Sequence, residues 1–114
     1  MEINKNKLYL KQDILDILNN ILRSCNNKDY QLALKYVNLF QKIIWEDNGG
    51  KDLYANLNSE KENCLQDLAI DLDYYGVNVS KDDIDIGIKD LNFEDDRLIF
   101  IKEIEKTINV LKND

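Results

Sequence analysis

The chain reads Leu65-Gln-Asp-Leu-Ala-Ile-Asp-Leu-Asp-Tyr-Tyr-Gly76 over residues 65–76. Apolar side chains recur there every three or four residues, which is the spacing of one face of an α-helix. Gly76 is expected to end this helix after Tyr75, because glycine readily adopts the left-handed conformation found at helix ends. The apolar face is formed by Leu65, Leu68, Ala69 and Leu72.

The opposite face of the same helix combines acidic side chains with large apolar ones. Its residues are Asp67, Ile70, Asp71 and Tyr74, at positions i, i+3, i+4 and i+7. An exposed isoleucine and tyrosine beside aspartates would suit a protein partner, because apolar anchors supply affinity and acidic neighbours steer association. The alternative is that residues 76–91 fold over Ile70 and Tyr74 and make them part of the core.

Negative charge is concentrated in residues 71–96. Nine carboxylates and two lysines give this segment a net charge of −7, which equals the charge of the whole chain. The acidic residues 94–96 fall in the first turn of an expected helix, where the helix dipole favours negative charge. Asp82, Asp83 and Asp85 are interpreted as charge partners for a basic protein or, alternatively, as a solvated acidic loop.

Metal binding and catalysis find little support in the sequence. Asp83, Asp85 and Glu94 have the spacing of calcium ligands in an EF-hand, but Gly87 stands where a further ligand is needed. The chain has no histidine, which is the usual general base and the commonest metal ligand. It also has no glycine-rich nucleotide-binding motif. We therefore expect no metal, no cofactor and no enzymatic activity.

Composition indicates a single helical domain over residues 1–114. A chain of 114 residues with 44% hydrophobic content can bury one core. We find no apolar run of about 20 residues and no secretion signal, so we expect a cytoplasmic protein that does not enter a membrane. In that compartment Cys25 and Cys64 should be reduced, buried side chains. A sequence pI of about 4.6 argues against direct nucleic-acid binding and for a basic protein partner.

Two helices are predicted in the first half of the chain. The first covers about residues 9–24, where apolar side chains from Leu10 onward fall within one half of the helical wheel. The asparagines at 26–27 are expected to break it and to supply the N-cap of a second helix over about residues 29–46. Trp45 lies off the apolar stripe of the second helix, and we interpret it as a lid on the core rather than a binding anchor.

The start of the third helix has two alternatives. Ser59 and Glu62 form a capping box that would open the helix at Ser59. A longer helix would instead begin at Asp52. We favour the longer helix, because Leu53 and Leu57 stay broadly on its apolar side.

The remaining residues complete the expected architecture. Residues 76–91 alternate apolar and polar side chains, which favours an extended acidic loop that places its isoleucines under the helices. Asn92, with Asp95 three residues later, should cap a last helix whose apolar stripe runs from Phe93 to Leu111. Four amphipathic helices with short connections predict an all-α fold, an antiparallel four-helix bundle.

The second half of the chain resembles the colicin D-type immunity proteins, the bacterial self-protective colicin-like immunity family. Three features carry the resemblance in order: Asp71-Leu-Asp-Tyr-Tyr75 at a helix end, Asp82-Asp-Ile-Asp85 in an acidic loop, and an amphipathic helix from Leu98 to Leu111. Family members often have a proline-containing loop after the aromatic pair. This chain departs from that pattern with Gly76-Val-Asn-Val.

The resemblance implies a four-helix bundle that binds the C-terminal toxic domain of a cognate bacteriocin or contact-dependent toxin. In the family that domain is a tRNA-cleaving nuclease, and the immunity protein covers its basic RNA-binding surface, which suits an acidic partner. We expect a monomer that forms a 1:1 complex. The contact residues would be Asp67, Ile70, Asp71, Tyr74, Asp82, Asp83 and Asp85. The alternative is a structural or regulatory helical module that self-associates or docks on a larger assembly.

Overall fold

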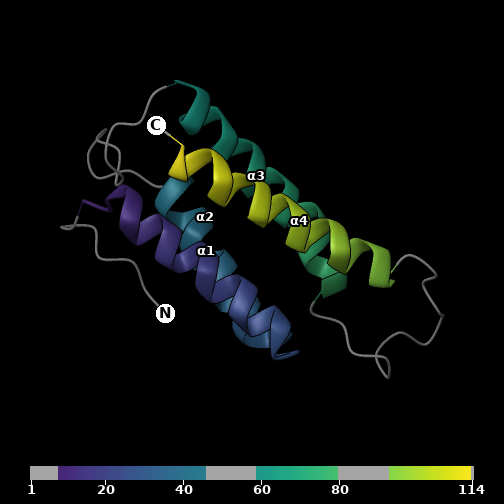
Figure 1. Ribbon diagram of the computed structural model, residues 1–114. Coiled ribbons are helices and arrows are strands. Elements are labelled where there is room, and N and C mark those ends of the chain that lie inside the picture. Colours follow the sequence, from purple (N-terminus) through teal and green to yellow (C-terminus); the bar gives the residue numbers. More distant parts are fainter. Residues whose placement is uncertain (1–7, 46–58, 80–92, 114) are drawn as a thin grey trace.

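The computed structural model describes the backbone of residues 8–45, 59–79 and 93–113, and the side chains of residues 8–45, 59–72 and 98–113. These ranges contain the helices α1 (Lys11–Asn26), α2 (Tyr30–Trp45), α3 (Ser59–Val79) and α4 (Phe93–Lys112) (Figure 1). α1 packs against α2 and α4, and α3 packs against α4 and α2. Consecutive helices run in opposite directions (Figure 1). The predicted antiparallel four-helix bundle is therefore confirmed.

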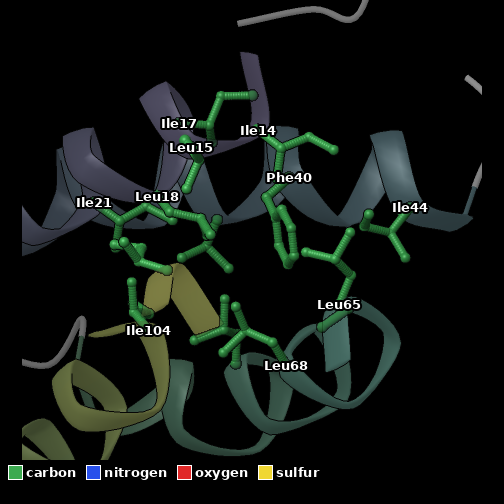
Figure 2. Close-up of a cluster of buried hydrophobic side chains, with 14 of the residues drawn as sticks. Ile14, Leu15, Ile17, Leu18, Ile21, Phe40, Ile44, Leu65, Leu68 and Ile104 are labelled. Atoms are coloured by element: carbon green, nitrogen blue, oxygen red, sulfur yellow. The ribbon is translucent and has the colours of Figure 1, made fainter. Parts of the chain in front are cut away.

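The interior of the bundle is filled by apolar side chains from every helix. In Figure 2, side chains such as Phe40, Leu65 and Leu68 point into the space between the helices. A fully buried leucine, isoleucine or phenylalanine contributes about 1.5–3 kcal/mol relative to an exposed one, so this cluster is the main source of stability. Its fully buried members include Ile14, Leu18, Ile21, Phe40, Leu65, Leu68, Phe100 and Ile104.

α1 begins and ends two residues later than predicted, at Lys11 and Asn26. The backbone amide of Leu10 donates a hydrogen bond to Asp13 Oδ2 at 2.8 Å, which places Leu10 at the N-cap, just outside the helix. The Leu10 side chain is exposed and does not join the core stripe. The prediction was wrong here because a helical wheel assigns helix geometry to residues that precede the helix.

The turn between α1 and α2 corrects the predicted cap. Asn26 is still inside α1, and Lys28 adopts a left-handed backbone conformation with φ 59°. Asp29, rather than an asparagine at 26–27, caps α2, since its Oδ1 accepts a hydrogen bond from the Leu32 amide at 3.2 Å. The prediction named a suitable residue type, but the chain needs Lys28 to reverse direction before the next helix can start.

α3 departs from the prediction at its end. The described part of the helix starts at Ser59, which is the start that the capping-box alternative predicts. The favoured longer helix would add residues 52–58, and these lie outside the described residues. The helix passes through Gly76 and continues to Val79, so residues 77–79 are helical rather than extended. Glycine in a helix is less favourable than alanine by about 0.5–1 kcal/mol, which continued backbone hydrogen bonding can offset.

α4 begins at Phe93, one residue after the predicted cap. Asn92 itself, and the rest of the predicted extended loop from residue 80, lie outside the described residues. Phe100, Ile108 and Leu111 are buried, as the predicted stripe requires. Within the described ranges, no helix is both long enough and apolar enough to cross a membrane.

Candidate functional site

α3 has a buried face and an exposed face. Leu68 and its neighbours on the apolar stripe are at most 1% exposed, whereas Ile70 is 58% exposed. Asp67 is exposed beside Ile70, and Asp71 is half-buried. Ile70 is therefore an accessible apolar side chain with the Asp67 carboxylate exposed beside it. Its contact with a partner stays a prediction, and residues 80–91, which the alternative folds over it, lie outside the described residues.

Most of the other predicted contact residues lie outside what the structure describes. Tyr74 is within α3, but its side chain is not among the described ones. Asp82, Asp83 and Asp85 fall between α3 and α4, in residues outside the described ranges. Their participation in a site stays a prediction.

Two side-chain contacts show which flank of α3 faces which neighbour. On one flank, the Cys64 thiol donates to Thr107 Oγ1 of α4 at 3.7 Å. Thr107 in turn donates from its hydroxyl to the Glu103 carbonyl oxygen at 2.9 Å, so this buried hydroxyl is satisfied. On the other flank, Gln41 of α2 donates from Nε2 to the carbonyl oxygen of Ala69 at 3.1 Å.

The exposed face of α3 thus lies between two helix seams, one with α4 and one with α2. Asp71 follows Cys64 by seven residues, two helical turns, and so lies on the flank that faces α4. Ile70 points away from both seams, toward the outside of the bundle. This arrangement places an apolar side chain at the centre of the outer face and carboxylates toward α4.

Further large apolar side chains are exposed on neighbouring helices. Trp45 at the end of α2 is 53% exposed, so it does not act as the closed lid that the sequence suggested. On α4, Leu98 is 53% exposed and Ile99 is 38% exposed. Sequence reasoning assigned neither α4 residue to a surface, although both lie off the stripe formed by Phe100 and Ile104, which was the available signal.

A cavity of about 200 Å³ lies where α1 turns into α2. Its lining includes Asn20, Ser24, Asp29 and Tyr36. The Ser24 hydroxyl donates to the Asn20 carbonyl oxygen at 2.8 Å, and Asp29 caps α2 as described above. The Ser24 hydroxyl therefore bonds within α1 and the Asp29 carboxylate caps α2, which gives both groups a structural role.

Neither a metal-binding group nor a cysteine identifies a functional site in the described part of the chain. There, no group of three histidine, cysteine, aspartate or glutamate side chains is arranged to hold a metal ion. The calcium interpretation of Asp83, Asp85 and Glu94 involves side chains outside the described ones. Cys25 and Cys64 are not joined in a disulfide, and Cys25 is buried as expected while Cys64 is only half-buried.

Comparisons with known proteins leave the site to be argued from its geometry. No protein-family model, curated protein or solved structure matches this chain.

Proposed function

We propose that this protein is an immunity protein that binds the nuclease domain of a cognate bacterial toxin and blocks its basic substrate-binding surface. A tRNA-cleaving ribonuclease is the target class that the resemblance to colicin D-type immunity proteins implies. The protein would act as a monomer in a 1:1 complex, without chemistry of its own. Inhibition would follow from occupation of the surface that the RNA needs.

The observation that carries the proposal is Ile70, which is 58% exposed on α3 with Asp67 exposed beside it. A large apolar side chain in such surroundings is suited to anchor a partner, because its burial on binding contributes affinity. The neighbouring carboxylates would meet lysine and arginine side chains and would fix the register of the contact. The four-helix architecture is also the one that the resemblance implies.

The distribution of charge over the helices supports a directed approach of a basic partner. The sequence of α3 contains five carboxylates and one lysine, whereas α2 contains two lysines and no acidic residue. A basic domain would therefore be drawn to the α3 side of the bundle and not to the α2 side. Residues 71–96, which include the end of α3, carry a net charge of −7 and would add to this attraction.

The test begins with the gene immediately upstream. If it encodes a large protein with a basic C-terminal domain, that domain is purified and mixed with this chain, and RNA cleavage is measured at two salt concentrations. We expect stoichiometric inhibition and association that slows as salt rises, since exposed charges are screened. An upstream domain that is neither bound nor inhibited contradicts the proposal.

Matched variants sharpen this test. Asp67→Lys reverses a charge on the α3 face, whereas Lys42→Glu reverses one on the exposed side of α2. We expect Asp67→Lys to slow association at low salt by about tenfold and Lys42→Glu to leave it unchanged or slightly faster. A self-associating helical module, the alternative function, would instead give a dimer by analytical ultracentrifugation. The two variants would then self-associate at the same rate.

A further inference from the structure

We infer that the partner-binding surface continues from α3 across the α3–α4 seam to Ile99 and Glu103, and that it fits a segment in which lysines or arginines flank an apolar side chain. This inference rests on the proposed function and names the partner chemistry of the same site. Neither Ile99 nor Glu103 was assigned to the surface from sequence.

The register between α3 and α4 follows from a single contact. Cys64 of α3 lies beside Thr107 of α4, with Sγ and Oγ1 3.7 Å apart. Because the two helices are antiparallel (Figure 1), each step toward the end of α3 matches a step toward the start of α4. Asp71, about 10 Å further along α3 at 1.5 Å per residue, is therefore level with Phe100.

The same register identifies the α4 residues that border the seam. Thr107 faces α3, and Glu103 lies one turn before it on the same flank. Ile99 lies one further turn back, rotated partly toward the outside, which agrees with its 38% exposure. Asp67 and Asp71 thus form one side of the seam, Glu103 and Ile99 form the other, and buried Phe100 forms its floor.

Charge complementarity identifies the occupant. Asp67 is exposed, and Asp71 and Glu103 are half-buried, so all three carboxylates remain accessible from outside. Carboxylates of this kind are suited to meet lysine and arginine side chains of a protein partner. Lys102 and Lys106 are also exposed on α4. Lys106 follows Ile99 by two helical turns on the same flank, so the acidic surface ends before it.

Ile70 and Ile99 complete the surface with two accessible apolar side chains. By the register above, Ile70 is level with residue 101 of α4, so the two isoleucines lie within about one helical turn of each other along the bundle. A partner segment that inserts an apolar side chain beside them would bring its lysines or arginines close to Asp67, Asp71 and Glu103. This matches a basic nuclease surface better than an acidic or uncharged one.

The test compares adjacent residues on α4, using the upstream-encoded basic domain as the binding partner. We expect Ile99→Ser to weaken binding by about tenfold, and Leu98→Ser, the control on the opposite flank, to change it by less than about twofold. The control is demanding because Leu98 is more exposed than Ile99, so exposure alone would predict the reverse order. Equal effects of the two variants would overturn the inference.

A second pair tests the charge. Glu103→Gln should slow association at low salt by about two- to fivefold, whereas Glu105→Gln, an exposed glutamate away from the seam, should not. If Ile70→Ser weakens binding while the Ile99 and Glu103 variants behave like their controls, the extension to α4 is wrong and the immunity function stands.

A probe that does not depend on the upstream domain separates failure of the proposed surface from failure of the proposed function. The isotope-labelled chain is titrated with a short peptide of alternating lysine and leucine, and amide shifts are followed by NMR. Shifts that concentrate at residues 67–71 and 99–103 support the surface, even if the upstream domain does not bind and the proposed function fails. Shifts that concentrate on α1, or that spread evenly over the bundle, overturn the surface.

Discussion

The two faces of α3 differ sharply in how far their side chains are exposed to solvent. Leu68 is 1% exposed and Ile70, two residues later, is 58% exposed. Both are large aliphatic side chains on one helix, so the difference comes from their direction and not from their chemistry. The comparison teaches that stability and binding can be assigned to separate faces of one element, and that each assignment can be tested alone.

The largest expected effect belongs to the buried face. Leu68→Ala leaves a cavity among the core side chains of Figure 2, and such truncations typically lower the free energy of unfolding by about 2–5 kcal/mol. Urea denaturation followed by circular dichroism measures it. A loss below about 0.5 kcal/mol would mean that this face of α3 is not packed as the structure shows.

A substitution where α3 faces α4 should lower the free energy of unfolding by an intermediate amount. Thr107→Val keeps the shape of the side chain but removes the hydroxyl, which accepts from the Cys64 thiol and donates to the Glu103 carbonyl oxygen. We expect the free energy of unfolding to fall by about 0.5–1.5 kcal/mol, with Thr107→Ser, which keeps the hydroxyl, as the control. If the valine variant is as stable as the native chain, the hydrogen bond from Cys64 to Thr107 does not help to hold α3 on α4.

Sequence reasoning predicted the buried face of α3 well, because helical spacing alone separates Leu68 from Ile70. It failed where a local signal competes with longer-range structure. Gly76 resembles a stop signal, yet the helix continues to Val79. The contact between Cys64 and Thr107 joins residues 43 positions apart, and nothing in one sequence indicates such a pairing. The pairing of α3 with α4 along this seam was therefore not predictable, although the helical spacing of Ile99 did indicate its exposure.

The correction at Gly76 can be tested directly. Because Gly76 lies inside α3, Gly76→Ala should raise the free energy of unfolding by about 0.4–1 kcal/mol, as the alanine chain loses less backbone freedom on folding. A glycine at a left-handed helix end, as the sequence suggested, would give the opposite sign, since alanine is disfavoured there. Thermal unfolding of the two proteins at one pH distinguishes the signs.

The smallest expected change in stability is on the exposed face. Ile70→Ser removes an apolar side chain that is already mostly in water, and serine and isoleucine have similar helix propensities, so the free energy of unfolding should change by less than about 0.5 kcal/mol. The same variant should weaken inhibition of the basic nuclease domain by about tenfold or more. Unchanged stability with lost inhibition would separate the two faces completely. A destabilisation close to that of Leu68→Ala would instead show that Ile70 is covered in the native protein, which would remove it from the partner surface.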